Sequence, residues 1–79
     1  MPVRVFLSSI LRKHAPNYDA AQGLEVELKE ETTVSDLCRR LNLPEDKIKL
    51  VMVNGKNESL SYRLKGDERV ALFPPVGGG

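Results

Sequence analysis

A single helical stripe among several alternating segments is the feature that most limits what this 79-residue chain can fold into. Between residues 34 and 41, apolar residues recur at the i, i+3, i+4 and i+7 spacing that places them on one helical face. The residues of this stripe are Val34, Leu37, Cys38 and Leu41. A lone helix with one apolar stripe must bury that stripe against structure formed by the rest of the chain.

Both ends of this helix are marked. Thr33 is a good N-cap because its hydroxyl accepts a hydrogen bond from a free amide of the first turn. Asp36 stands three residues later, where it can reach back as an aspartate version of the capping box. Asn42 and the Leu43–Pro44 pair end the helix, because the residue before a proline is pushed out of the α region.

Most other apolar residues alternate with polar ones, which is typical of strands. Strands are predicted over residues 1–8, 24–29, 50–53 and 69–73, and a short edge strand with an irregular connection over residues 57–64. Short helical turns are expected over 10–14 and 44–47. Asn54–Gly55 is the strongest hairpin signal in the chain, and Pro74–Pro75 ends the last strand because proline cannot continue a hydrogen-bonded ladder.

The order is therefore strand, strand, helix, strand, short strand, strand. It predicts an α+β protein with a mixed four- to five-stranded sheet packed on one main helix, the ubiquitin-like β-grasp. In that fold the first and last strands commonly lie side by side and parallel at the centre of the sheet. Residues 1–73 are expected to form this one domain, and residues 74–79 a flexible C-terminal tail.

Composition excludes several functional classes. Cys38 is the one cysteine, so an internal disulfide and a cysteine-based metal cage are excluded, and a reducing, cytoplasmic compartment is favoured. Its place on the apolar stripe indicates a core residue. Apolar runs are too short for a membrane span, the N-terminus lacks the plan of a signal peptide, and no metal-binding or catalytic motif is present. His14 has no companion ligand, and the net charge of +1 gives no strong attraction to nucleic acid.

The glycines at residues 77–79 indicate chemistry, because they bury no side chain and lose the most entropy on ordering. Pro74–Pro75 stiffens the exit from the last strand, so the tail is expected to project outward as a thin probe. A carboxylate is a poor electrophile, and acyl transfer from Gly79 requires activation, most simply as an acyl-adenylate. The adenylate then either accepts sulfur as a thiocarboxylate or is captured by a cysteine or lysine in protein conjugation.

Three motifs carry a resemblance to a known family. They are the Val53-Asn54-Gly55 hairpin, the Leu64-Lys65-Gly66-Asp67 turn, and the segment from Val70 to Val76 ahead of the glycines. With the β-grasp order, they resemble the sulfur-carrier family, which comprises the molybdopterin synthase small subunit (MoaD) and the thiamine sulfur carrier (ThiS). The Phe-Pro-Pro-Val-x-Gly-Gly ending is most similar to the molybdopterin branch.

The resemblance implies a carrier that is not an enzyme by itself. Gly79 is implied to be adenylated by an E1-like adenylyltransferase that uses ATP, with no cofactor bound to the carrier. The tail then enters the synthase large subunit, or another sulfur-acceptor enzyme, and donates sulfur to the pterin. By position, Gly77 and Gly78 line the partner's channel, and residues Phe73, Pro74, Pro75 and Val76 form the neck.

Strand parity predicts a second partner-binding feature. If Val3 and Val5, Val51 and Val53, and Val70 and Leu72 face the helix, their neighbours in sequence face away from it. With the first, third and last strands adjacent, an apolar patch is expected on the outer face of the sheet from Phe6, Met52, Ala71 and Phe73.

Three other interpretations stay open. In the first, the sulfur goes to thiamine, cysteine or tRNA thiolation in place of molybdopterin. In the second, the chain is a ubiquitin-like modifier that becomes attached to lysines. In the third, it is a β-grasp interaction domain with an inert tail, in which Arg39, Arg40, Lys47 and Lys49 bind an acidic partner or RNA.

Overall fold

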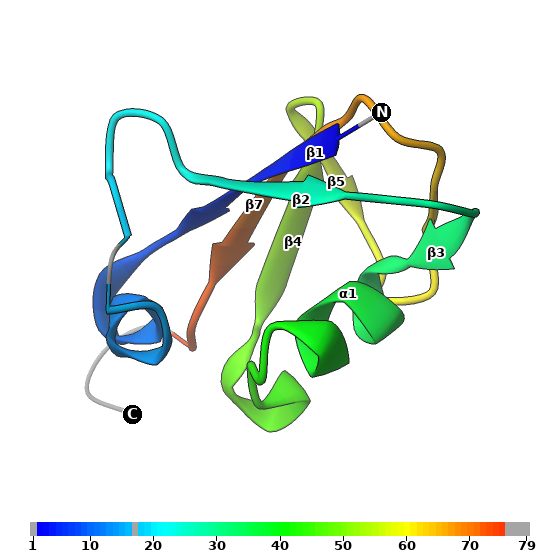
Figure 1. Cartoon of the computed structure of the whole chain (residues 1–79). Coiled ribbons are helices and arrows are strands. Elements are labelled where there is room, and N and C mark those ends of the chain that lie inside the picture. Colours follow the sequence, from blue (N-terminus) through cyan, green and yellow to red (C-terminus); the bar gives the residue numbers. More distant parts are fainter. Residues whose placement is uncertain (1, 17, 76–79) are drawn as a thin grey trace.

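The computed structural model describes residues 2–16 and 18–75. Within these residues, seven strands, one α-helix and two short 3-10 helices follow one another. Figure 1 shows their arrangement. In chain order they are β1 (Pro2–Leu7), η1 (Ser9–His14), β2 (Leu24–Glu27), β3 (Thr32–Thr33), α1 (Val34–Arg40), η2 (Glu45–Lys47), β4 (Leu50–Val53), β5 (Lys56–Glu58), β6 (Arg63–Leu64) and β7 (Arg69–Phe73).

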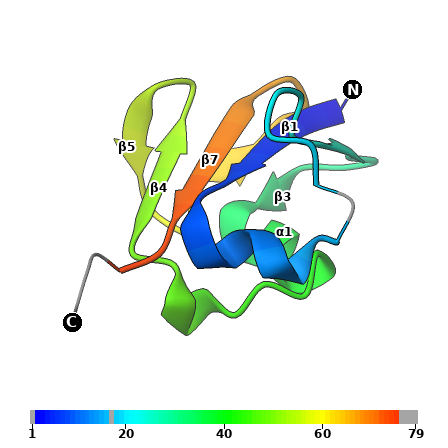
Figure 2. The same ribbon diagram turned by 90° about the vertical axis from the view of Figure 1, so that its left-hand side faces the viewer.

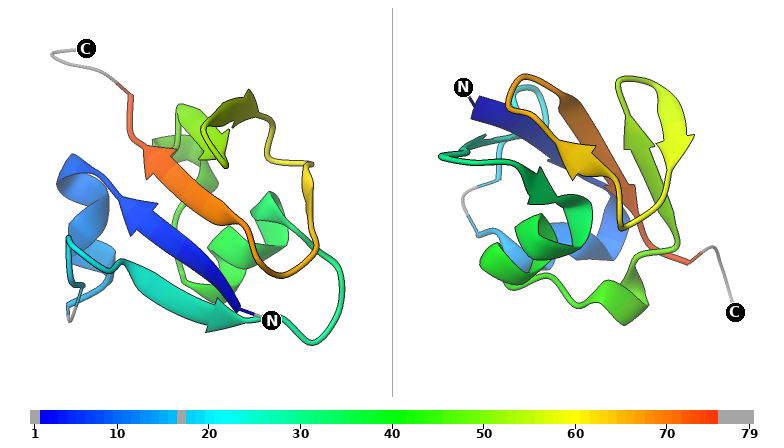
Figure 3. Two further views of the ribbon diagram at one scale, coloured as in Figure 1. Left: turned by 90° about the horizontal axis from the view of Figure 1, so that it is seen from above. Right: turned by 90° about the vertical axis from the view of Figure 1, so that its right-hand side faces the viewer.

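Five of the strands form one mixed sheet in the order β2-β1-β7-β4-β5. The first and last strands, β1 and β7, are parallel neighbours at its centre, and the other pairs are antiparallel. Figure 3 shows β2, β1 and β7 side by side, and α1 lies across one face of the sheet in Figures 1 and 2. The prediction of a mixed β-grasp sheet on one helix is confirmed.

A separate two-stranded sheet was not predicted. Thr32 and Thr33 of β3 pair antiparallel with Leu64 and Arg63 of β6. Strands of two residues carry no readable alternation, and their pairing depends on a contact between segments about thirty residues apart. The same neighbourhood satisfies the start of α1, because the N–H groups of residues 34 and 35 donate to the carbonyls of residues 62 and 60 at 3.0 and 2.8 Å.

The helix ends as its sequence predicts, with one difference at the start. Thr33 Oγ1 accepts from the Asp36 N–H at 3.1 Å, so the N-cap is confirmed. The Asp36 carboxylate does not complete the expected capping box; it accepts from Arg39 at 2.8 Å. At the other end Asn42 takes a left-handed φ of 61°, and the Leu43 N–H donates to the Cys38 carbonyl at 2.8 Å. This is a Schellman motif with asparagine in the position usual for glycine.

The core lies between α1 and the five-stranded sheet. The alternating residues of the three central strands that were expected to face the helix are at most 4% exposed: Val3, Val5, Leu7, Val51, Val53, Val70 and Leu72. Val34, Leu37 and Cys38 of α1 meet them with no exposed surface, and Leu41 packs against the cluster while partly exposed. Cys38 is therefore a core residue, as predicted. Within the described residues, no helix is long and apolar enough to cross a membrane.

Candidate functional site

The face of the sheet opposite α1 carries the residues that strand parity assigns to it. The register places Phe6 of β1 and Met52 of β4 on either side of Ala71 of β7, while Phe73 follows at the next outward position of β7. All four are half-buried, and none packs against the core cluster. The expected patch therefore exists as a surface, because β1, β7 and β4 are adjacent in the sheet.

A fifth apolar residue belongs to this patch and was not predicted. Leu50 lies directly opposite Phe73 in the β4–β7 register, and its neighbour Val51 points into the core. Alternation alone places Leu50 outward with Met52, so the signal was present in the sequence. We use "outer patch" below for Phe6, Leu50, Met52, Ala71 and Phe73.

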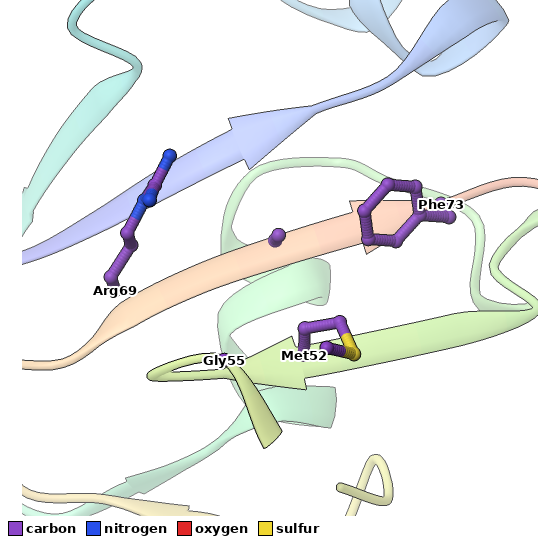
Figure 4. A pocket seen from close by; sticks show the side chains of 5 residues that line it. Met52, Gly55, Arg69 and Phe73 are labelled. Atoms are coloured by element: carbon purple, nitrogen blue, oxygen red, sulfur yellow. The ribbon is translucent and has the colours of Figure 1, made fainter. Parts of the chain in front are cut away.

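A hollow of about 250 Å³ opens in the outer patch (Figure 4). It is lined by Met52, Gly55, Arg69, Ala71 and Phe73. Figure 4 shows Met52 projecting from β4 and Phe73 from β7, with Arg69 and Gly55 toward the other end. The hollow exists because Ala71, a small residue, lies between larger ones along β7.

The β4–β5 turn fixes the Gly55 end of the hollow. Asn54 and Gly55 have φ values of 51° and 82°, so both are left-handed, as in the type I′ hairpin that this residue pair predicts. Asn54 also fastens the turn to the start of β7. Its side-chain oxygen accepts from the Arg69 N–H at 2.9 Å, and its own N–H donates to the Arg69 carbonyl at 2.8 Å.

Phe6 lies beside the hollow and does not line it. Its ring supports the guanidinium of Arg69, whose central carbon is 4.2 Å from the ring centroid. On another side the ring lies so close to Gly23 that a Cβ there would be 3.1 Å from the ring and 2.6 Å from the Val5 carbonyl oxygen. The ring is thus held by its surroundings, and Arg69 covers part of the surface expected for a partner.

The exit of the chain from β7 is fixed on both sides. The Ser8 N–H donates to the Leu72 carbonyl at 3.2 Å, and the Lys49 N–H donates to the Phe73 carbonyl at 2.8 Å. Pro74 is half-buried and Pro75 is exposed. Figure 2 shows the chain leaving β7 toward the side of the molecule away from α1. Val76, Gly77, Gly78 and Gly79, to which the sequence assigns the tail chemistry, lie outside the described residues.

Two further residues, Cys38 and His14, carry side chains that can take part in chemistry. Burial, together with the charge of nearby Glu45, raises the pKa of Cys38 to about 11, so its thiol stays protonated near neutral pH. His14 is half-buried at the end of η1. In residues 2–16 and 18–75, no group of His, Cys, Asp and Glu side chains could hold a metal ion.

The basic residues of the alternative interpretation do not form one uncompensated cluster. Arg39 lies 2.8 Å from Asp36 and 3.8 Å from Glu45, and Arg40 donates to the Glu27 carbonyl at 2.8 Å. Lys47 and Lys49 are exposed. Half of the cationic group is therefore engaged within the domain.

Comparison with known proteins identifies the family of this chain and structures similar to it. The model of the ThiS family matches residues 14–79, which include the glycines at the end of the sequence. The candidate molybdopterin converting factor subunit 1 from Pyrococcus furiosus superposes with a TM-score of 0.72 at 26% identity, covering 96% of this chain and 99% of that one. SAMP1 from Haloferax volcanii shares the fold over 100% of both chains, with a TM-score of 0.70 at 24% identity. No curated protein matched the sequence.

The matched family comprises small carriers that are generally not catalytic by themselves, and the structure has the β-grasp fold expected of them. By its sequence match and its fold, this chain belongs to the ThiS family of ubiquitin-like sulfur-carrier proteins.

Proposed function

We propose that this protein carries sulfur as a C-terminal thiocarboxylate on Gly79 and donates it in molybdopterin synthesis, as the small subunit of a synthase. The observation that carries the proposal is the family match, which extends through Gly79. The pterin pathway is favoured by the Pyrococcus furiosus protein, described as a molybdopterin converting factor subunit, which aligns over nearly its whole length.

The chemistry needs a partner that binds ATP. The Gly79 carboxylate attacks the α-phosphorus of ATP, a new P–O bond forms, and pyrophosphate leaves. Sulfide then attacks the acyl carbon, the bond to AMP breaks, and a thiocarboxylate remains with no change in oxidation state. Glycines at 77 and 78 suit this task because a Cβ would crowd a channel that grips the backbone.

The domain contributes recognition and aim. We propose that the outer patch binds an E1-like adenylyltransferase first and the synthase large subunit afterwards. The patch and the end of β7 share one strand, since Ala71 and Phe73 precede Pro74 directly. Docking on this face would therefore set the direction in which the tail enters the partner. A cytoplasmic location fits the one buried thiol, which needs no oxidising compartment.

A second candidate is sulfur delivery to a different acceptor, as in thiamine synthesis. It is favoured by the family model itself, which is that of ThiS. The activation chemistry is the same for both, and the difference lies in the enzyme that takes the sulfur.

The test is intact-mass spectrometry of the protein purified from its own host. A carrier should show a species heavier by the difference between one sulfur and one oxygen atom, with the extra mass on residue 79. A set of larger conjugates in its place would indicate a protein modifier, and an unchanged mass under conditions of active cofactor synthesis would contradict the proposal.

A truncated protein lacking Gly78 and Gly79 is the matched variant. It should keep the far-UV circular dichroism spectrum of the full chain, because every described helix and strand lies before residue 74. It should fail to restore cofactor synthesis in a host deleted for the carrier. Restoration by the truncated form would show that the tail is not the reactive part.

A further inference from the structure

Within residues 2–16 and 18–75, Arg69 at the rim of the hollow is a cation without an acidic partner. Among the described residues its guanidinium makes no salt bridge, and it lies over the Phe6 ring, 4.2 Å from the ring centroid. The residue is exposed. A guanidinium has five N–H donors, and contact through its face with a ring leaves these donors available.

The charge of Arg69 is also next to a like charge. The β1–β7 register places Arg4 directly beside Arg69, on the same outer face. Arg4 is compensated, because it lies 3.8 Å from Glu25 and donates to the Gln22 carbonyl at 2.8 Å. Among the described residues, the uncompensated charge of this pair is therefore that of Arg69.

The ring of Phe6 holds this cation in place. A cation over an aromatic face is attracted electrostatically by the ring, even at an exposed site. Phe6 is itself restrained by the close approach of Gly23, so the arginine is oriented before any partner arrives. An oriented donor loses less conformational entropy on binding than a free side chain does.

The hollow next to Arg69 suits one apolar side chain. Its volume of about 250 Å³ lies below the ~300–1,000 Å³ typical of small-molecule sites. Met52, Ala71 and Phe73 supply an apolar wall and floor, and Arg69 supplies the one charged group of the lining. The combination is complementary to a carboxylate that stands beside an apolar side chain.

We propose that Arg69 and the hollow together recognise a partner segment in which an aspartate or glutamate neighbours an apolar residue. The apolar side chain enters over Ala71, between Met52 and Phe73, and the carboxylate pairs with the guanidinium on Phe6. This inference rests on the proposed carrier function and names the E1-like adenylyltransferase as the protein that presents the segment. Arg69 is then a specificity residue for docking, and Phe6 is its positioning residue.

The experiment measures binding of the full-length carrier to the E1-like adenylyltransferase of the same organism by isothermal titration calorimetry. Arg69→Gln should raise Kd about tenfold and Arg69→Glu about a hundredfold, as expected for loss and reversal of one charge pair. The matched control is Arg63→Gln. Arg63 is an exposed arginine of β6, in the separate two-stranded sheet, and it pairs with Glu31, so its replacement should leave Kd unchanged. Equal Kd values for wild type and both Arg69 variants would overturn the inference.

Thermal melting separates recognition from a structural role. Arg69→Gln removes both the attraction of the guanidinium to the Phe6 ring and the like charge beside Arg4. These effects oppose each other, so its Tm should differ from that of the wild type by less than about 4 °C while its binding weakens. A larger fall in Tm together with the loss of binding would show that Arg69 acts through stability, and would overturn the proposal. If the Arg69 variants lost affinity for RNA but bound the adenylyltransferase as tightly as the wild type, Arg69 would be a phosphate-binding residue. That result would also overturn the proposal.

A charge exchange gives the strongest form of the test. Cross-linking from position 69 identifies the nearest partner carboxylate, and its replacement by arginine should restore binding of the Arg69→Glu carrier. The outcomes separate the two proposals. If the native protein carries a thiocarboxylate but the Arg69 variants bind the adenylyltransferase normally, this inference alone is wrong. If the native protein carries no thiocarboxylate and the wild type does not bind the enzyme, both the proposed function and this inference are wrong.

Discussion

Replacing Glu68 by glutamine should destabilise the fold strongly, although the two side chains have nearly the same size. Glu68 is 5% exposed, and its carboxylate turns back to the loop before β7. Oε1 accepts from the Gly66 N–H at 2.9 Å and the Asp67 N–H at 3.2 Å, and Oε2 accepts from the Lys65 N–H at 2.9 Å. The Glu68 carbonyl also accepts from the Arg4 N–H at 3.0 Å, so this loop is attached to the central strand pair.

The magnitude follows from the hydrogen bonds. Glutamine keeps one acceptor oxygen but places an amide N–H₂ opposite one of the backbone donors. The loss of one hydrogen bond to a charged group contributes about 1.5–3 kcal/mol, and an unsatisfied buried donor adds about 1–3 kcal/mol. Water can reach residues 65 and 67, whereas Gly66 is buried. A cost of roughly 2–4 kcal/mol is therefore expected, from a total of roughly 4–12 kcal/mol for a chain of this length.

The pH dependence gives a second signature. Burial raises the pKa of Glu68, but hydrogen bonds from the backbone N–H groups of residues 65–68 outweigh it and hold the pKa below its usual range. A carboxylate whose folded pKa is lowered contributes stability at pH values above its unfolded pKa of about 4.3, and that contribution is lost as pH falls through the folded pKa. Glutamine does not titrate, so the stability difference between the two proteins should shrink below about pH 4.

Urea unfolding at pH 7 and at several lower pH values measures both effects. Far-UV circular dichroism is the suitable probe because the chain has no tryptophan. Glu58→Gln is the control, since Glu58 is a half-buried glutamate in β5 with no recorded backbone partner for its carboxylate in the described part of the chain. A difference under about 0.5 kcal/mol at pH 7, or one that does not change with pH, would refute this account of the loop.

Two further predictions concern Gly23 and Cys38. Gly23→Ala should cost about 2–4 kcal/mol in urea unfolding, because its φ is +72° and the new Cβ would lie 2.6 Å from the Val5 carbonyl oxygen. Gly55→Ala, with a φ of +82° and open space for the Cβ, should cost only about 1–2 kcal/mol, and equal costs would show that the contact is irrelevant. The Cys38 thiol, whose pKa is raised to about 11 by burial and by Glu45, should resist a thiol reagent at pH 8 and react once urea unfolds the chain. Rapid labelling of the native protein would contradict its place in the core.

Local patterns in the sequence predicted most of the fold because each depends on neighbouring residues. Alternation assigns side chains to the two faces of β1, β4 and β7. The Asn54–Gly55 pair predicts the hairpin after β4, because both residues adopt the positive φ values that the turn requires. Thr33 and Asn42 mark the helix ends through backbone groups within a few residues. The predicted strands extend one or two residues too far at the ends of β1 and β2. There the hydrogen-bonded pairing stops before the alternation of apolar and polar residues does.

Features that depend on distant contacts could not be read in this way. The β3–β6 pair and the hydrogen bonds from the start of α1 to residues 60 and 62 join segments far apart in the chain. The burial of the Glu68 carboxylate was not predicted, since nothing in the neighbouring sequence indicates it. The placement of Arg69 over Phe6 requires β1 and β7 to be parallel neighbours, a relation between the two ends of the domain.

The sequence by itself determined the β-grasp order, the apolar faces and the family, because periodicity, turn residues and a terminal glycine motif are properties of short segments. Tertiary structure alone decided that Ala71 leaves a hollow between Met52 and Phe73, and that Arg69, which has no acidic partner in the described part of the chain, lies at its rim over Phe6. The physical reason is that a partner-binding surface is assembled across strands. Its shape and charge depend on strand order and register, which are fixed only when the whole sheet forms.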